Sequence, residues 1–247
     1  MSSANMDELK LVGRITTSAL REGRTALLEP EAKAICQVYG LPVPAFQTAT
    51  TQEQAAEFAE KVGFPIVLKI VSPDILHKTE AGGVLLNLNS TVDVENGYKS
   101  ILSNAKAYKS DARLEGVLVQ HMAPPGIEII VGGLRDPQFG PVVMFGLGGI
   151  FTEVLKDVTF RLVPINEREA REMIREIRGY RVLAGLRGRP PADEKAVAST
   201  LVRVSEVMNE NESIAQIDLN PVMVYSSGCS IVDARIILSI QGQTITR

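Results

Sequence analysis

The sequence predicts a layered α/β or α+β fold, and two observations support this prediction. Apolar residues recur at helical spacing in some segments and alternate or run together in others, so helix and strand patterns follow one another along the chain. Of the 247 residues, 45% are hydrophobic and 22% are charged, which is ordinary for a folded globular protein. A chain of this length accommodates one large domain or two closely associated subdomains.

The first half of the chain contains predicted elements with recognisable starts and ends. One helix has Pro30 at its start and Gly40 just past its end, and a second has Thr50 and Glu53 in capping-box spacing. The predicted elements are, in order, a helix over 29–40, an extended connection over 41–50, a helix over 50–63, strands over 65–71 and 83–89, a helix over 94–108 and a strand over 117–122.

A break rich in proline separates this half from the next. Residues 123–126 read APPG, which interrupts regular structure and predicts a hinge between subdomains. Further on, Asn166 and Glu169 form another capping-box pattern. The predicted elements here are strands over 127–133 and 141–149, helices over 166–178 and 193–209, and a terminal hairpin over 214–238.

The terminal hairpin brings three oxygen-bearing side chains together. If its turn is centred on Ser227, Pro221 lies opposite Asp233. Asn220 and Asp233 then become cross-strand neighbours, close to Asp218. Carboxylate and amide oxygens are hard ligands that suit Mg²⁺, so a metal-nucleotide site is one interpretation. The other is that Asp and Asn cap strand ends and turns here, as they often do.

Charge and composition argue against several classes of partner. The formal net charge of -3 disfavours a surface for nucleic acid or for an anionic membrane, since both select clustered positive charge. The start of the chain lacks the apolar segment of a signal peptide, and no apolar run reaches the roughly 18 residues of a membrane span. We therefore expect a cytoplasmic protein. Cys36 and Cys229 form no metal-binding or disulfide pattern.

The stretch KIVSPDILHKTEAGGV, residues 69–84, holds two residues that packing does not explain. Lys69 interrupts an apolar strand, where a bare charge is costly, so it either reaches nucleotide phosphates or snorkels from the strand end. His77 lies in a polar loop that ends in glycines. Its imidazole is a candidate nucleophile or ligand, and the competing interpretation is a surface residue without a task.

Three further features have more than one interpretation. Glu128 stands in a strand of isoleucines and valines, where it either contacts a ligand or faces solvent. His121 is expected to make structural or backbone contacts. The GLGG run at 146–149 does not fit a dinucleotide fingerprint, because Phe151 stands where the third glycine is needed. The run either lets backbone approach a phosphate or forms a simple turn.

Three blocks of the sequence resemble a known family. They are LKIVSPDILHKTEAGGVLLNL, LVQHMAPPGIEIIVGGLRDPQFGPVVMFGLGGIFTEVLKDVTFRLVPI, and IAQIDLNPVMVY with VDAR. These blocks resemble the ATP-grasp subunits of NDP-forming acyl-CoA synthetases, and more narrowly the β subunits of ADP-forming acetyl-CoA synthetases. The resemblance covers nearly the whole chain from Ala26 onward, and SPDILHKTEAGGV is highly specific to the family.

The resemblance implies an ATP-grasp fold of two subdomains that clamp a nucleotide and Mg²⁺. We expect an N-terminal helical extension over 1–25 and an N-terminal subdomain over 26–118, which carries a phosphohistidine loop at 72–83. The C-terminal subdomain would span 119–247 and carry the Mg²⁺-binding hairpin.

The resemblance also implies roles for individual residues. In the family, phosphate passes from an acyl phosphate to a histidine of the partner and then to a histidine of the ATP-grasp subunit, which by motif is His77. Lys69 would contact nucleotide phosphates. Asn220 and Asp233 would bind Mg²⁺, and Asp218 would hydrogen-bond the His77 ring and fix its tautomer.

The glycines of the loop and the strand before the hinge have implied roles as well. Gly82 and Gly83 would let the histidine loop move. The residues that would lie near the nucleotide are Val119, Gln120, His121, Met122 and Glu128.

The reaction implied by the resemblance interconverts acyl-CoA, ADP and phosphate with carboxylic acid, ATP and CoA. The CoA-binding domains of the family are not found in this sequence, so the chain would need an α subunit, in an α2β2 heterotetramer. The alternatives are a succinyl-CoA synthetase-like β subunit and a catalytically inactive nucleotide-binding regulatory module. A standalone carboxylate-amine ligase would leave His77 without a task.

Overall fold

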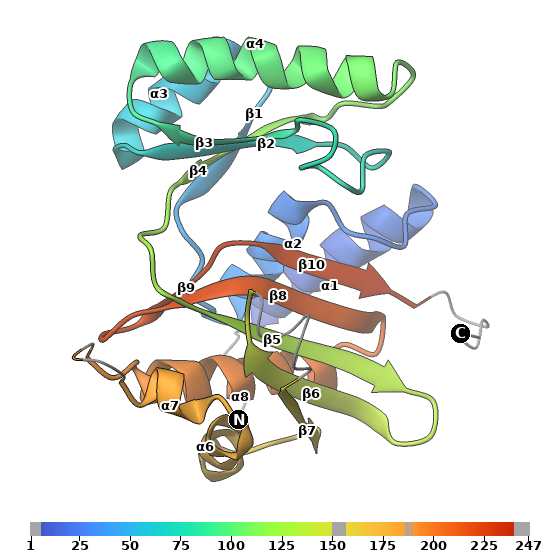
Figure 1. Ribbon diagram of the computed structural model, residues 1–247. Coiled ribbons are helices and arrows are strands. Elements are labelled where there is room, and N and C mark those ends of the chain that lie inside the picture. Colours follow the sequence, from blue (N-terminus) through green and yellow to red (C-terminus); the bar gives the residue numbers. More distant parts are fainter. Residues whose placement is uncertain (1–5, 150–156, 186–187, 189, 240–247) are drawn as a thin grey trace. The chain divides into compact units, whose positions relative to one another are not determined.

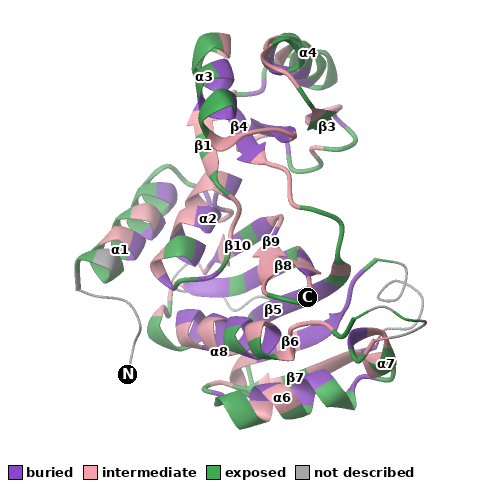
Figure 2. Ribbon diagram, turned by 90° about the vertical axis from the view of Figure 1, so that its left-hand side faces the viewer, coloured by how far each residue is buried: buried purple, intermediate pink, exposed green. Residues whose placement is uncertain are grey.

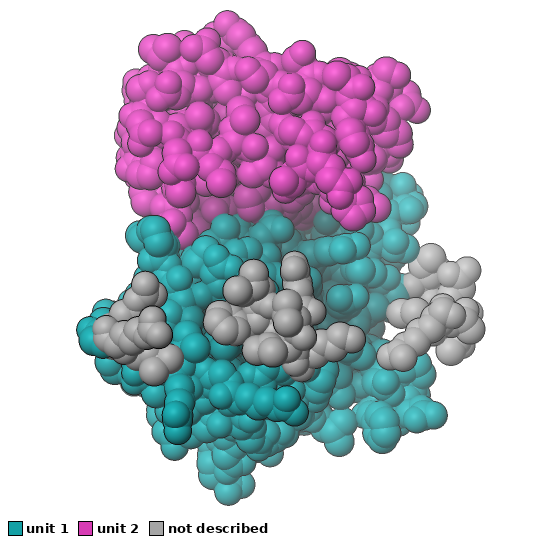
Figure 3. All heavy atoms as spheres, in the orientation of Figure 1, with its two compact units in different colours: residues 1–27, 31–43, 124–247 teal, residues 28–30, 44–123 magenta. Residues whose placement is uncertain are grey.

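The computed structural model describes residues 6–149, 157–185, 188 and 190–239, and these form two compact units. Unit 1 comprises residues 1–27, 31–43 and 124–247, and unit 2 comprises residues 28–30 and 44–123 (Figure 3). The chain therefore passes between the units several times, and each unit is built from segments that are distant in sequence.

Unit 2 is a four-stranded antiparallel sheet with two helices over one face (Figure 1). The strand order is β1-β4-β2-β3. The elements are β1 (Phe46–Ala49), α3 (Gln52–Val62), β2 (Ile66–Val71), β3 (Val84–Leu88), α4 (Thr91–Tyr108) and β4 (Gly116–His121). In Figure 2 the outer side of α4 is exposed and β4 is buried.

The two faces of the unit 2 sheet differ in chemistry. Leu68 and Ile70 of β2 point to the helix-covered face and are fully buried in a cluster with Val94 and Ile101 of α4. Lys69 stands between them in sequence, so its side chain points to the opposite face. A strand buried along its whole length has thus placed one ammonium group on the face opposite α3 and α4.

Unit 1 is an antiparallel sheet with the strand order β10-β8-β5-β6-β7, and β9 also pairs with β8. Its strands are β5 (Ile127–Asp136), β6 (Gly140–Leu147), β7 (Val158–Leu162), β8 (Ile214–Val224), β9 (Cys229–Ile231) and β10 (Ala234–Leu238). Its helices are α1 (Met6–Arg21), α2 (Glu29–Val38), α6 (Glu167–Glu176), α7 (Tyr180–Leu183) and α8 (Glu194–Glu210). No helix in the described part of the chain is long and apolar enough to cross a membrane.

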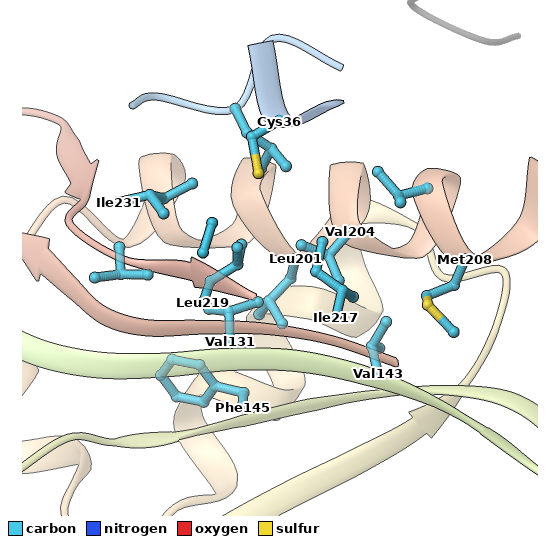
Figure 4. Close-up of a cluster of buried hydrophobic side chains, with 14 of the residues drawn as sticks. Cys36, Val131, Val143, Phe145, Leu201, Val204, Met208, Ile217, Leu219 and Ile231 are labelled. Carbon is cyan, nitrogen blue, oxygen red and sulfur yellow. The ribbon is translucent and has the colours of Figure 1, made fainter. Parts of the chain in front are cut away.

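The core of unit 1 lies where α8 packs against the sheet (Figure 4). The apolar stripe of α8 contributes the fully buried Leu201, Val204 and Met208. They meet buried side chains of β5 and β8, among them Val131 and Leu219. Each such side chain contributes about 1.5–3 kcal/mol by leaving water, so this layer fixes the sheet whose other face carries Asp218.

The predicted helices and central strands are present, and the differences concern one helix N-cap and three additional elements. The N-cap of α3 is Thr51, whose side chain accepts from Gln54 N–H, and not Thr50. The sequence TTQEQ offers both threonines a partner three residues on, and the pattern cannot choose between them. The predicted box of Asn166 and Glu169 is confirmed at α6. The elements that were not predicted are β1, β7 and α7.

The compact units also differ from the predicted subdomain boundaries. A boundary between residues 118 and 119 would cut β4, which pairs with β1 and β2 along its length and so belongs to one unit. The passage lies between residues 123 and 124. The N-terminal helix is not a separate extension, because Val12 and Ala19 of α1 are buried in the unit 1 core.

The terminal hairpin has a register one residue away from the predicted one. Val224 pairs with Cys229, so the turn holds four residues, ending in Gly228 with φ +77°. Val232 N–H donates to the Pro221 carbonyl at 3.0 Å, so Val232 and not Asp233 lies at Pro221. An even number of turn residues centres the turn between two residues and not on Ser227.

Candidate functional site

Lys69 shares one buried carboxylate with a residue of the histidine loop. Its Nζ donates to Glu29 Oε1 at 2.6 Å, and Lys78 Nζ donates to Glu29 Oε2. The side chains of Glu29, Lys69 and Lys78 are 3%, 8% and 24% exposed, so solvent screens the first pair little. We call these three residues the Glu29 cluster. One carboxylate thus binds both the lysine of β2 and a lysine of the loop that carries His77.

Both ends of the histidine loop are fixed to unit 2. Asp74 accepts hydrogen bonds from Arg113 N–H at 2.8 Å and from Nε and Nη2 at 3.1 Å each. Hydrogen bonds from the Arg113 side chain and backbone lower the pKa of Asp74 to about 2. Ile75 and Ala81 are buried in the unit 2 core. The loop therefore has two apolar anchors and one ionic anchor in addition to Lys78.

The tip of the loop is open to solvent. The side chain of His77 is 72% exposed, and its Nδ1 lies 3.9 Å from Glu80 Oε1. Leu76 is 66% exposed, which is uncommon for a leucine next to a buried isoleucine. An exposed pair at this separation contributes little. The imidazole is therefore available to a reagent from outside unit 2.

The two glycines of the loop are required by local geometry. Gly82 has φ +60°, a backbone conformation that disfavours side chains. A Cβ at Gly83 would lie 2.5 Å from Ile70 Cγ2. The predicted role of these glycines in loop movement stays a prediction, because close packing already explains why glycine stands at Gly83.

The strand predicted to lie near adenine is the end of β4. Val119 is in the unit 2 core, and Gln120 is fully buried on the face that carries Lys69. His121 N–H donates to the Ala45 carbonyl at 3.0 Å, and Met122 N–H to the Pro65 carbonyl at 2.8 Å. His121 thus makes the backbone contact expected of it. Any contact from the last two residues to a base would use their carbonyl oxygens or side chains.

The predicted metal ligands lie on the β8 hairpin of unit 1. Asp218 and Asn220 are two residues apart on β8 and so share a face of the sheet. Asp233 lies in the short break between β9 and β10, next to Ala234, which pairs with Leu219. The hairpin therefore does bring Asn220 and Asp233 to the same position along the ladder.

Burial and two neighbouring charges act on Asp218 of this hairpin. Burial raises the pKa of Asp218, the charge of Arg235 lowers it, and the charge of Asp233 raises it again. The two carboxylates thus repel each other, and a divalent cation would relieve this repulsion. Two carboxylates and one amide are hard oxygen donors, so the set fits Mg²⁺, which keeps waters or phosphates as its other ligands.

A buried lysine of α2 holds the same hairpin in place. Lys33 of α2 is fully buried, and its Nζ donates to the Val232 carbonyl at 2.9 Å. Ile231 N–H donates to the Pro42 carbonyl at 2.7 Å. These bonds fix the residues just before Asp233 and place a positive charge close to it.

Glu128 is exposed on β5 and lies against the glycine run. Gly148 N–H donates to the Glu128 carbonyl at 2.8 Å, and a Cβ at Gly148 would lie 2.9 Å from Glu128 Cβ. This close approach explains the glycine without a phosphate. A role of Glu128 in nucleotide binding stays a prediction.

The structure brings some predicted site residues together and leaves other pairs untested. Within unit 2 it joins Lys69 to the loop of His77, and within unit 1 it joins Asp218 to Asp233. A hydrogen bond from Asp218 to His77 would join different units and stays a prediction. In the described part of the chain, no group of three or more His, Cys, Asp or Glu side chains is placed to hold a metal.

Sequence reasoning missed Glu29, Lys33 and Lys78. A weak signal existed for Lys33, because it interrupts the buried stripe of Ala32 and Cys36 on α2. None existed for Glu29, which stands 40 residues before Lys69 and reads as an ordinary acidic residue in the first turn of a helix.

Comparison with known proteins gives a consistent result. A family profile for the ATP-grasp domain matches residues 18–238. The chain is 48% identical over 233 residues to acetate–CoA ligase (ADP-forming) I subunit beta of Pyrococcus furiosus, covering 94% of this chain and 100% of that protein. It is 47% identical to acetate–CoA ligase (ADP-forming) I of Archaeoglobus fulgidus, covering 89% of this chain but 32% of that longer protein.

A solved structure shows the same fold with ligands. It is the dinucleotide forming acetyl-coenzyme A synthetase 1 of Ca. Korarchaeum cryptofilum, in complex with coenzyme A and Mg-AMPPCP, with its phosphohistidine segment pointing towards the nucleotide binding site. The TM-score is 0.82 at 46% identity, over 92% of this chain and 100% of that chain.

Proposed function

The chain belongs to the ATP-grasp family, among the β subunits of ADP-forming acetate–CoA ligases, and from this premise we propose that it transfers phosphate between a nucleotide and His77. The full reaction converts acyl-CoA, ADP and phosphate to carboxylic acid, ATP and CoA, or runs in reverse. Acetate is the proposed acid, because the similar Pyrococcus protein is an acetate–CoA ligase.

The observation that supports this proposal best is the position of His77 beside the Glu29 cluster. The histidine is exposed, its neighbour Lys78 is bound to the carboxylate that also binds Lys69, and Lys69 lies on the sheet face opposite α3 and α4. A nucleophile and a phosphate-binding cation are thus held in one unit, as phosphoryl transfer requires.

In the proposed transfer, a ring nitrogen of His77 attacks the γ-phosphorus of ATP. The bond from that phosphorus to the oxygen bridging to the β-phosphate breaks, a nitrogen–phosphorus bond forms, and ADP leaves. Lys69 stabilises charge on the phosphate oxygens. The Asp218 carboxylate would accept a hydrogen bond from the N–H of the other ring nitrogen and so keep the attacking nitrogen unprotonated.

Mg²⁺ would be held by Asn220 and Asp233, with Asp218 close by. When bound, the metal neutralises charge on the phosphates and orients them. The hairpin supplies these ligands in fixed positions because Lys33 and the β8 ladder hold it.

The proposed partner is a CoA-binding α subunit, in an α2β2 assembly. Two findings support it: the similar Pyrococcus chain is a subunit, and this chain spans about a third of the longer Archaeoglobus ligase. A partner would supply the acyl-phosphate chemistry, and the exposed His77 would carry phosphate to and from it.

Isotope exchange between ADP and ATP tests the proposal on this chain alone. With Mg²⁺ present, labelled ADP should become labelled ATP through the phosphorylated enzyme, and a His77→Asn variant should lose this exchange. Lys61→Met changes an exposed residue of α3 in the same unit and is the control. Exchange that persists in His77→Asn would contradict the assignment.

The full reaction separates the alternatives. With a CoA-binding partner, acetate, CoA and ATP, formation of acetyl-CoA and ADP supports the proposed acid. Faster turnover of succinate would favour a succinyl-CoA synthetase-like subunit, and nucleotide binding without any exchange would favour an inactive regulatory module.

A further inference from the structure

The carboxylate of Glu29 is shared, and this sharing has a consequence for the loop. One oxygen binds Lys69, the residue proposed to hold nucleotide phosphate, and the other binds Lys78, the residue after His77. The two lysines therefore draw on the same negative charge. At 3% exposure, that charge is almost unscreened by water.

We infer that Glu29 is a positioning residue that couples nucleotide binding to docking of the histidine loop. When the γ-phosphate attracts Lys69, the hold of Glu29 on Lys69 weakens and its hold on Lys78 strengthens. The loop is then kept at the nucleotide. This inference rests on the proposed role of Lys69 in phosphate binding.

The coupling has a direction that suits the proposed reaction. ATP carries the γ-phosphate that engages Lys69, so ATP holds the loop docked while transfer occurs. After transfer, ADP no longer carries that phosphate, and Lys69 returns to Glu29. Lys78 is then held less firmly, which lets the loop leave with the phosphate on His77.

Reciprocity makes the coupling measurable in both directions. If bound ATP strengthens loop docking by some factor, loop docking must strengthen ATP binding by the same factor. Replacing Lys78 removes one of the two lysines that share the Glu29 carboxylate, so Lys69 is bound more tightly and becomes less available to phosphate. A Lys78→Met variant should therefore bind ATP more weakly, although Lys78 itself touches no nucleotide in this account.

The anchored ends of the histidine loop limit the movement to the segment between them. Ile75 and Ala81 are buried and Asp74 is held by Arg113, so the ends of the loop stay in place. Lys78 lies between these anchors and is 24% exposed. Breaking its bond to Glu29 would release the segment around His77 without unfolding unit 2.

Hydrogen exchange of the loop, with and without a non-hydrolysable ATP analogue, tests this inference. In the unmodified chain the analogue should slow amide exchange of residues 76–80 by about fivefold or more, and ADP should slow it less. In Glu29→Gln and in Lys78→Met this response should disappear, although both variants still bind the analogue. Glu31→Gln removes another carboxylate from the same helix, one that binds Arg24, and should keep the response.

The binding data complete the test. In the chain that keeps Glu29, Lys78→Met should raise the Kd for the analogue by the factor by which the analogue slows loop exchange. In the Glu29→Gln variant, adding Lys78→Met should leave the Kd unchanged. A loop response that survives in both variants would overturn the inference. So would an unmodified chain that binds the analogue without any change in loop exchange.

Failure of the proposed function gives a different result. It would show as absence of ADP–ATP exchange, whereas the loop measurement needs only binding of the analogue. If Glu29→Gln does not fold, Lys78→Met alone decides, because its side chain lies near the surface and its loss leaves the ion pair of Glu29 with Lys69 intact.

Discussion

The Glu29 cluster of unit 2 and the β8 hairpin of unit 1 carry opposite charge, and they are stabilised in different ways. In the cluster, two ammonium groups share one carboxylate, so its charges are paired within the fold. In the hairpin, burial raises the pKa of Asp218, and the charge of Arg235 lowers it by more than the charge of Asp233 raises it. The cluster is thus held by ion pairs within unit 2, whereas the hairpin carries a buried carboxylate that we propose to lie close to a bound cation.

This difference assigns the two regions different tasks. A paired cation cluster can present Lys69 in a fixed direction and exchange its carboxylate partner for a phosphate. The carboxylates of the hairpin can bind a metal that arrives with the nucleotide.

The largest effect is expected from Lys69→Met. Loss of a preorganised positive charge at the phosphate should slow ADP–ATP exchange by about 100-fold or more. The matched control is Lys61→Met, which removes an exposed lysine from α3 of the same unit. Equal rates in the two variants would show that Lys69 is a structural ion-pair partner only.

Asp233→Asn should come next. The Mg²⁺ concentration needed for half-maximal exchange should rise by about tenfold or more, and high Mg²⁺ should restore part of the rate. The pKa of Asp218 should fall at the same time, because the charge of Asp233 raises it. Titration with Mg²⁺ measures the concentration needed for half-maximal exchange. The control Glu212→Gln changes an exposed residue and should leave that concentration unchanged. An unchanged concentration in Asp233→Asn would exclude Asp233 as a ligand.

A smaller effect concerns stability and pH at Asp218. Its pKa is raised in the folded state, so the stability it contributes is present below its unfolded pKa and is lost as pH rises through the folded value. The Tm of Asp218→Asn relative to the unmodified chain should therefore rise as pH increases from acid to neutral. The rise should be about 2–4 °C for each kcal/mol of unfolding free energy that the charged Asp218 costs the unmodified chain.

Mg²⁺ should reverse the order of the two Tm values. It should raise the Tm of the unmodified chain at neutral pH and raise that of Asp218→Asn less, because the variant lacks one of the two repelling carboxylates. Thermal scans between acid and neutral pH check both points. A variant that is less stable than the unmodified chain at neutral pH without metal would contradict a raised pKa of Asp218.

The smallest effect is expected from Arg113→Ala at the base of the histidine loop. Arg113 holds the pKa of Asp74 at about 2, so this pair contributes stability above the unfolded pKa and loses it as pH falls towards about 2. The pair lies near the surface, with 61% of the Arg113 side chain exposed, so the effect is small. Hydrogen exchange at residues 72–75 should rise at neutral pH and not at acid pH.

Much of the fold was predictable because its signals are local. The β-branched, apolar run of β2, the stripe of α8 and the box at Asn166 each determine an element from neighbouring residues. The hairpin register was not predictable, since a turn of three residues and a turn of four residues leave nearly the same sequence pattern. The unit boundaries were not either, because α1 packs on the unit 1 core through contacts distant in sequence.

The candidate site divides in the same way. His77 and Lys69 stand out as polar residues in unexpected places, and the hairpin carboxylates follow from a β-turn. Glu29 was missed because its meaning depends on two lysines that are 40 and 49 residues away. A carboxylate that pairs over such a distance leaves no periodic pattern in the sequence.

The most direct test is to locate phosphate in the chain after incubation with Mg²⁺ and γ-labelled ATP. Peptide mapping under alkaline conditions should find one acid-labile phosphate at His77, in an amount that depends on Mg²⁺ and is lost in Lys69→Met. The control Lys61→Met should be labelled normally. Phosphate at another residue, or label that persists in a His77→Asn variant, would contradict the account.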